Sequence, residues 1–222
     1  MICAFTGHRP ERLPWGRNED DLRCAALKTL LRRTVREVYD RGFHTFLCGM
    51  ARGCDQYFAE AVLAARADGA QDAQLCALVP CPSQPDGWDE ASVARYWALL
   101  AACDQLEVLE DHYSPGCMLR RNREMLRRAQ LLISVYDGTP GGTAATVRLA
   151  EELGITVVPL WMGGVGRQNL STNLRPTMHF AMQELFLKIC SCRSRRRSVT
   201  DVGLPLAGTH RPGSLHRFYG NL

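Results

Sequence analysis

The chain has 222 residues, of which 46% are hydrophobic and 23% are charged. This composition is typical of a globular protein and excludes both a globally disordered chain and a disulfide-stapled miniprotein. Residues 1–160 contain 18 Lys and Arg against 21 Asp and Glu, whereas residues 161–222 contain 9 against 2, so the net charge of +4 comes from the C-terminal part. No run approaches the roughly 18 apolar residues of a membrane span and no signal-peptide pattern opens the chain, which predicts a cytoplasmic protein.

Short apolar runs alternate with longer amphipathic segments through residues 1–160. The expected strands are residues 2–5, 43–48, 75–79, 106–109, 131–136 and 155–160, and the expected helices are 20–41, 55–66, 89–102, 115–128 and 143–153. In the first helix, apolar residues from Leu27 to Val38 recur every three to four positions and Gly42 follows as a stop. Alternation of this kind predicts a three-layer, Rossmann-like, doubly wound α/β domain with a mostly parallel sheet of about six strands.

After residue 160 the alternation ends. Residues 161–190 have the composition of a linker followed by a short amphipathic helix at 178–189, and residues 191–222 are rich in Gly, Pro, Ser and Arg. We therefore expect a ligand-binding domain at 1–160, a linker with one helix at 161–190, and a basic, largely disordered tail at 191–222. Such a tail could attract nucleic acid or anionic lipid, or have no role.

The ten cysteines form neither a disulfide framework nor a zinc pattern. Five of them lie inside apolar periodic segments, where a reduced thiol packs as a small hydrophobe, namely Cys3, Cys24, Cys48, Cys76 and Cys103. Cys190 and Cys192 form a CxC without a second pair at zinc-ligand spacing. We expect free, mostly buried thiols and no metal site.

The loops that follow the strands hold the candidate site, because ligands of open α/β sheets bind outside the carboxyl ends of the strands. Gly141 and Gly142 lie between a strand and a helix, where glycine lets the backbone approach a ligand and the helix N-terminus favours a phosphate. Thr143 is expected to cap that helix. The alternative is an ordinary tight turn, and neither the GxGxxG nor the P-loop pattern is present.

Two further loops have similar character. Residues 48–55 again join a strand to a helix, with Gly49 and Gly53 freeing the backbone and Asp55 available as a cap. Residues 6–10 bring His8 and Arg9 to the end of the first strand, where their side chains could bind a phosphate or carboxylate. The alternative is that both side chains are solvated. We expect the two glycine loops to face one shared pocket.

The spacing of residues in the expected helix at 115–128 places its polar side chains on two different faces. Arg121 and Asn122 lie three and four residues after Met118, beside the apolar stripe, and can point into a cleft. Arg120, Arg123 and Arg127 form a separate face, expected to be solvated or to contact a second subunit.

These motifs resemble the YpsA-like branch of the SLOG superfamily, a Rossmann-like fold shared by DprA and the LOG phosphoribohydrolases. The resemblance spans about residues 1–160 and rests on residues 6–10, 49–55, 80–82, 121–122 and 136–143. It implies a nucleotide-derived ligand, such as a nucleotide, NAD or an ADP-ribose-like molecule, bound between the glycine loops.

The same resemblance leaves two alternatives. LOG enzymes cleave the base from a nucleoside monophosphate and have MxxRxxxM and PGGxGTxxE motifs; Met118, Arg121 and Met125 match the first, which would make Arg121 a catalytic residue of an N-glycosidase. The second motif matches only at residues 140–142, and Arg148 replaces the glutamate that would act as acid or base. Residues 49–55 are also similar to the SGxAxGID segment of DprA, which binds single-stranded DNA. The net negative charge of residues 1–160 disfavours that role.

The function that we predict is binding or sensing of a phosphate-bearing nucleotide or ADP-ribose-like ligand, with no chemistry assigned. The predicted ligand-binding residues are Thr6, Gly7, His8, Arg9, Gly49, Arg52, Gly53, Asp55, Arg121, Asn122, Asp137, Gly141, Gly142 and Thr143. We expect Thr6, His8 and Arg9 to bind the polar ends of the ligand. Arg121 and Asn122 are expected to contact its sugar or phosphate, and Asp137 to accept a hydrogen bond from a ribose hydroxyl. The helices leave room for a homo-oligomer; nucleic acid is a less favoured partner.

Overall fold

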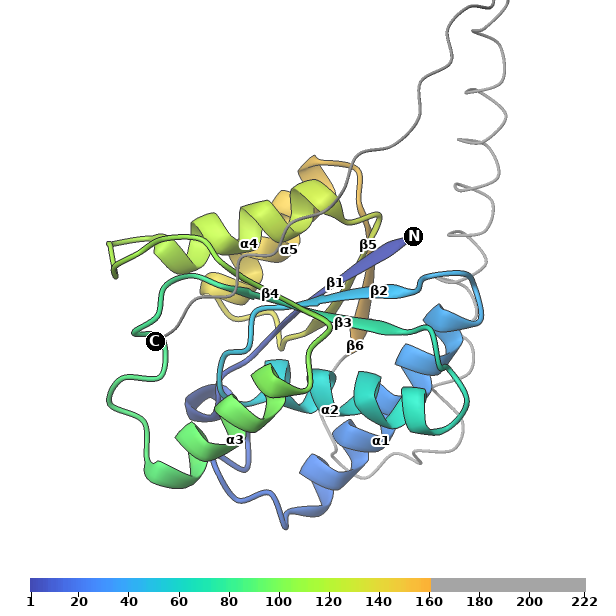
Figure 1. The fold of residues 1–222 in the computed structure, drawn as a ribbon, viewed down its shortest axis with the longest axis horizontal. Coiled ribbons are helices and arrows are strands. Elements are labelled where there is room, and N and C mark those ends of the chain that lie inside the picture. Colours follow the sequence, from blue (N-terminus) through green and yellow to red (C-terminus); the bar gives the residue numbers. More distant parts are fainter. Residues whose placement is uncertain (161–222) are drawn as a thin grey trace, which may run out of the picture. The chain divides into compact units, whose positions relative to one another are not determined.

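The structure is a computed structural model and describes residues 1–160. The predicted linker, the helix at 178–189 and the tail at 191–222 lie outside the described residues. Strands and helices alternate in the described part (Figure 1): β1 (Ile2–Gly7), α1 (Leu22–Tyr39), β2 (Thr45–Cys48), α2 (Cys54–Ala67), β3 (Gln74–Val79), α3 (Glu90–Ala101), β4 (Gln105–Val108), α4 (Cys117–Arg128), β5 (Leu131–Val135), α5 (Gly142–Glu152) and β6 (Thr156–Leu160). A short 3₁₀ helix, η1 (Pro10–Arg12), follows β1.

The predicted fold class is confirmed, and the element bounds differ by only a few residues. Local capping explains several of the differences. Helix α1 begins at Leu22 rather than at residue 20 because the Asp21 side chain accepts from the Arg23 amide at 2.8 Å. Helix α4 begins at Cys117 rather than at residue 115 because Gly116 adopts a left-handed conformation, with φ of 84°.

All six strands are parallel and lie in the order β4-β3-β2-β1-β5-β6. The chain first moves outward from β1 to β4 and then returns to place β5 on the other side of β1. Strand order therefore reverses between β1 and β5, which is where open α/β sheets form their ligand crevice.

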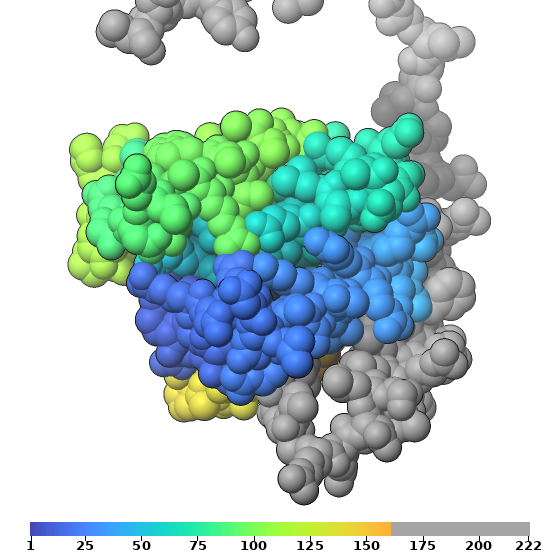
Figure 2. Space-filling model, turned by 90° about the horizontal axis from the view of Figure 1, so that it is seen from below, coloured from blue at the N-terminus to red at the C-terminus, as the bar shows by residue number. Residues whose placement is uncertain are grey.

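Helices cover both faces of the sheet (Figure 1): α1, α2 and α3 lie on one face and α4 and α5 on the other. Figure 2 views the molecule from the first of these faces, with α1 in blue and α3 in green. On that face Phe5 and Phe58 stack with ring centroids 4.4 Å apart. On the other face a core cluster joins the strands to α4 and α5, and its members are Ala4, Leu47, Cys76, Leu78, Met125, Leu126, Ala129, Leu132, Val147 and Ala150.

The eight cysteines of the described part are free thiols, and all except Cys103 are buried. Burial raises the pKa of Cys76 to about 11 and that of Cys103 to about 12, so these thiols stay protonated near neutral pH. No group of three or more His, Cys, Asp or Glu side chains in residues 1–160 could hold a metal ion. None of the helices described is long and apolar enough to cross a membrane.

Candidate ligand-binding site

The carboxyl ends of β1 and β5 meet at the reversal of strand order. Thr6 pairs with Ser134 and Gly7 with Val135, and the His8 amide extends the pairing by donating to the Val135 carbonyl at 3.1 Å. The loops after these two strands therefore leave the sheet side by side, and they bring together eight of the fourteen predicted site residues: Thr6, Gly7, His8, Arg9, Asp137, Gly141, Gly142 and Thr143.

His8 and Asp137 join the two loops. Nε2 of the buried His8 ring lies 2.9 Å from Oδ1 of Asp137 and 3.2 Å from its backbone nitrogen. The hydroxyl and the amide of Thr139 also donate to Oδ1, at 2.6 and 3.0 Å. The two Thr139 bonds, followed by His8, hold the pKa of Asp137 well below its usual range. Asp137 is therefore a carboxylate near neutral pH, and its Oδ1 organises the β5 loop.

The N-terminus of α5 opens toward solvent beside this pair. Gly141 is the N-cap, and the first intrahelical bond runs from the Ala145 amide to the Gly141 carbonyl at 2.9 Å. The amides of Gly142, Thr143 and Ala144 precede that bond and have no intrahelical acceptor. Gly142 is exposed, and a Cβ atom built on it would meet nothing within 4 Å.

The expected capping role of Thr143 is wrong. Thr143 is the second residue of α5, and its hydroxyl donates to the Gly7 carbonyl at 3.2 Å instead of accepting from an amide of its own helix. A threonine one turn further on, Thr146, donates to the Gly142 carbonyl at 2.8 Å. The two hydroxyls therefore fix the start of α5 against β1 and against its own first turn.

Arg12 lies against the same loop, although no motif or periodicity marks it in the sequence. Its Nη1 donates to the Pro140 carbonyl at 2.7 Å and contacts the Thr139 hydroxyl at 3.4 Å. A Cβ atom on Gly141 would lie 2.7 Å from this Nη1, so the absence of a side chain there admits the guanidinium. Arg12 thus places a cation next to the open end of α5.

The β2 loop packs directly on the β1 loop. The Cys54 amide donates to the His8 carbonyl at 3.2 Å, and a Cβ atom on Gly53 would lie 2.9 Å from Cδ of Pro10. Gly53, with φ of 88°, is the N-cap of α2, so the expected cap role of Asp55 is also wrong. One amide at the start of α2 is consequently occupied by a protein carbonyl.

Asp55 instead folds back on its own loop. The residue is only 6% exposed, and its Oδ2 accepts from the Ala51 amide at 3.2 Å. Burial raises the pKa of Asp55, while Arg121 and the Ala51 amide oppose that rise.

The side chains of Arg121 and Asn122, adjacent residues of α4, point in different directions. The Arg121 side chain is 4% exposed, donates through Nη1 to the Leu78 carbonyl at 3.3 Å, and lies against Gly49, where a Cβ atom would be 1.6 Å from Nη1. Burial lowers the pKa of Arg121, and the nearby Asp55 opposes this. Asn122 points the other way and donates to the Thr146 hydroxyl at 2.8 Å.

The Arg52 side chain is 17% exposed and lies between η1 and the start of α3. Its guanidinium lies 3.2 Å from Glu11 and 3.8 Å from Asp89, and it stacks over the Trp88 ring at 5.2 Å. Arg9, in the loop after β1, is exposed. Arg52 is therefore neutralised by carboxylates at the edge of the candidate site, and Asp55 and Arg121 are buried.

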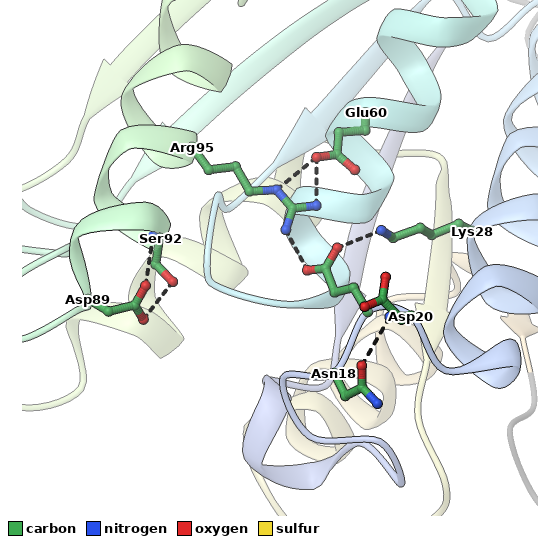
Figure 3. A network of polar contacts seen from close by, with 8 residues as sticks. Asn18, Asp20, Lys28, Glu60, Asp89, Ser92 and Arg95 are labelled. Carbon is green, nitrogen blue, oxygen red and sulfur yellow. Dashed lines mark hydrogen bonds and ion pairs between the residues drawn. The ribbon is translucent and has the colours of Figure 1, made fainter.

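A polar network anchors the long loop between β1 and α1 (Figure 3). Glu19, at the end of this loop, contacts Lys28 of α1 and Arg95 of α3, each at 2.5 Å, and Arg95 also contacts Glu60 of α2 at 2.8 Å. Burial alone would raise the pKa of Glu19, but the bonds from Arg95 and Lys28 outweigh it and lower the pKa. The network joins the site loop to three helices.

A cavity of 410 Å³ lies away from these loops, between β3, β4 and the end of α4. Its lining is Leu47, Cys76, Ala77, Leu78, Gln105, Leu106, Glu107 and Arg128, and it includes none of the predicted site residues. The strand-end loops, rather than this cavity, bring the candidate residues together.

Comparison with known proteins gives one family match. The YpsA family model, described as the YspA SLOG family, matches residues 3–152. No curated protein matches the chain. The similar solved structures include DNA processing protein A from Helicobacter pylori, described with a single-stranded DNA binding mode (15% identity, 88% of this chain and 81% of that chain, TM-score 0.49). They also include DprA from Streptococcus pneumoniae (13% identity, 82% of this chain and 56% of that chain, TM-score 0.47).

Proposed function

The chain belongs to the YpsA SLOG family, and from this premise we propose that it binds a phosphate-bearing nucleotide or ADP-ribose-like ligand at the joined ends of β1 and β5. In this proposal the phosphate lies at the N-terminus of α5. The observation that carries the proposal is the exposed Gly142 turn, whose amides lack intrahelical acceptors, at the reversal of strand order and next to the Arg12 guanidinium.

Electrostatics favour α5 over α2 as the phosphate position. At α2 the Cys54 amide already donates to the His8 carbonyl, and the buried Asp55 carboxyl lies in the first turn. An anion there would need to displace a protein acceptor beside an acidic group. At α5 the helix dipole and Arg12 both favour an anion.

A panel of ligands tests the proposal on three chains: the wild type, Gly142→Ala and Gly142→Glu. The ligands are inorganic phosphate, AMP, ADP-ribose and NAD. Binding of each is measured by thermal unfolding and by calorimetry. A ligand at 100 times its Kd stabilises the wild type by about 2.7 kcal/mol. Gly142→Ala should retain this stabilisation because a Cβ atom meets nothing there. Gly142→Glu should lose it, because the carboxylate competes with the phosphate for the helix end.

The two variants separate binding from folding. Glutamate in the first turn of a helix is favourable to the helix, so Gly142→Glu should unfold no earlier than Gly142→Ala without ligand. Absence of stabilisation of the wild type by every member of the panel would refute the proposed function. Equal binding by the wild type and Gly142→Glu would refute the phosphate position.

The two alternatives have less support in the site. An N-glycosidase needs Arg121 to reach a substrate, and that guanidinium is buried under Gly49. A single-strand binder needs a basic surface, yet three arginines of α4 are paired with carboxylates: Arg120 with Glu110, Arg127 with Glu124, and Arg128 with Glu107 and Glu124. Release of free base, or a salt-steep shift of single-stranded DNA, would favour the respective alternative.

A further inference from the structure

Strand β4 forms one edge of the sheet, and its outer side pairs with no strand among residues 1–160. All four of its residues are exposed. Just after β4, the Leu109 amide donates to the Val79 carbonyl at 2.9 Å, so the odd-numbered residues of this segment direct their backbone groups toward β3. The amides and carbonyls of Leu106 and Val108 consequently point outward, where a further strand can bond them.

Apolar side chains lie along the same edge. Glu107 contacts Arg128 of α4 at 2.6 Å. Side chains alternate along a strand, so Leu106 and Val108 lie on the opposite face of the sheet, which α1, α2 and α3 cover (Figure 1). These two residues are 51% and 45% exposed, because no helix of the described part covers the outermost strand completely.

Trp97 of α3 extends this apolar surface. Arg95, two positions earlier, contacts Glu60 of α2 at 2.8 Å, and α2 lies over the inner strands β1, β2 and β3. Two positions correspond to about 200° around a helix, so Trp97 points away from α2 and toward the outer side of the sheet. Trp97 is 54% exposed. The outer border of α3 and β4 therefore combines an open strand edge with three large apolar side chains.

The opposite edge of the sheet differs. Strand β6 contains the exposed Pro159, which has no amide hydrogen and obstructs the addition of another strand. Strand β4 contains neither proline nor lysine, and its one charged residue, Glu107, is neutralised by Arg128. Of the two edges, only β4 lacks the features that normally prevent pairing with another chain.

The charges of β4 favour a second copy of the same chain as the occupant. Antiparallel pairing about a two-fold axis at Leu106 places this residue opposite Leu106 of the second copy, and Gln105 opposite Glu107. An amide then lies beside each carboxylate, and that carboxylate already has a cation in its own chain. No unpaired like charges meet across the axis, so the edge is complementary to itself.

We propose that the chain forms a two-fold symmetric dimer in which the β4 strands pair antiparallel, centred on Leu106, and join the two sheets into one. Trp97 and Val108 of each copy lie beside this junction and lose exposure in the dimer. The proposal does not rest on the proposed ligand, because none of the predicted site residues lies in α3 or β4.

Sedimentation velocity of the full chain tests the dimer. The wild type at about 100 μM should sediment as a dimer and dissociate on dilution. Leu106→Lys should weaken dimerisation at least about tenfold, because two ammonium groups would face each other across the axis. Leu153→Lys is the matched control: Leu153 is 55% exposed at the end of α5, on the half of the sheet away from β4, and its replacement should leave the dimer intact.

An exchange of charge identifies the pairing itself. Leu106→Glu alone should be monomeric, because two carboxylates then meet across the axis. An equal mixture of Leu106→Lys and Leu106→Glu should restore the dimer, since opposite charges face each other. Misfolding of either variant would not be reversed by mixing, and circular dichroism of each variant should match that of the wild type.

Three results would overturn the dimer: a monomeric wild type, dissociation by Leu153→Lys as complete as by Leu106→Lys, or a mixture of the two charged variants that stays monomeric. The first of these would leave the β4 edge to a strand of a different protein. A silent ligand panel with a dimeric wild type refutes the proposed function and keeps the dimer, and a positive panel with a monomeric wild type does the reverse.

Discussion

Gly7, Gly49 and Gly142 all border the site, but each lacks a side chain for a different reason. None of the three has a positive φ, so backbone conformation does not require glycine. A Cβ atom on Gly7 would lie 2.4 Å from Cβ of Cys54, and one on Gly49 would overlap the Arg121 guanidinium. Space is open only at Gly142. Two of the glycines therefore serve packing, and the third leaves a helix end accessible.

Gly7→Ala should destabilise the protein by about 1–3 kcal/mol, the usual cost of overpacking. The clash is with a Cβ atom, which is fixed to the backbone of α2 and cannot rotate away. Urea denaturation followed by circular dichroism measures the change. Gly142→Ala is the control and should lie within about 0.5 kcal/mol of the wild type.

A double variant identifies the cause. Cys54→Gly removes the opposing Cβ atom, so Gly7→Ala should cost clearly less in a Cys54→Gly background than alone. Purely additive free energies of unfolding would show that the contact between β1 and α2 is not the source of the cost.

At the scale of elements, Glu19 joins the β1–α1 loop to α1 and α3, and through Arg95 to α2. This loop includes η1 and therefore positions Arg9 and Arg12. Tyr57 of α2 contributes cation–π contacts to the same network, because Lys28 lies 4.8 Å and Arg95 lies 5.3 Å from its ring centroid.

Glu19→Gln should lower the free energy of unfolding by about 1 kcal/mol, since a network of partly buried pairs is worth more than an isolated exposed one. Glu11→Gln is the matched control. Glu11 is in the same loop and pairs with Arg17 and Arg52, but its own side chain is 54% exposed. Glu11→Gln should therefore lower the free energy of unfolding by at most a few tenths of a kcal/mol. A cost for Glu11→Gln equal to that for Glu19→Gln would contradict the anchoring role of the network.

At the scale of the whole molecule, hydrogen bonds to carboxylates dominate the expected response to pH. The pKa is lowered for eight described carboxylates, namely Glu19, Asp21, Asp72, Asp89, Glu107, Glu110, Glu124 and Asp137, and it is raised for one, Asp55. A lowered pKa in the folded state contributes stability that is present above the unfolded value and is lost as pH falls through the folded value. Asp55 has the opposite sign, because burial raises its pKa.

Stability should therefore be steady above about pH 5 and fall between about pH 5 and pH 2, where unfolded Asp and Glu, with pKa values of about 3.9 and 4.3, protonate first. Glu124 provides a specific test, because hydrogen bonds from Arg127 and then Arg128 lower its pKa to about 2. Glu124→Gln should flatten the decline between pH 4 and pH 2 in denaturation measured at each pH. An unchanged slope would show that this ion pair does not contribute.

Much of the site follows from loop position in the sequence. Residues 6–9 and 141–143 were placed at strand ends by the alternation of elements, and the parallel sheet then requires those ends to share an edge. Arg12 could not be found in this way, because its role depends on a contact with Pro140, which is 128 residues away in the sequence. The caps expected at Thr143 and Asp55 were wrong because a glycine two residues earlier, Gly141 or Gly53, is the N-cap of each helix.

By itself the sequence determined the order and type of the elements, the parallel sheet and the membership of the candidate loops, because hydrophobic period and turn residues are local properties of the chain. Only the tertiary structure decided which side chains those loops use. The reversal of strand order brings His8 to Asp137 and Arg12 to the start of α5, while α4 directs Arg121 beneath Gly49 and Asn122 toward α5. Adjacent residues on a helix point in directions about 100° apart, so their partners depend on how the helix packs on the sheet.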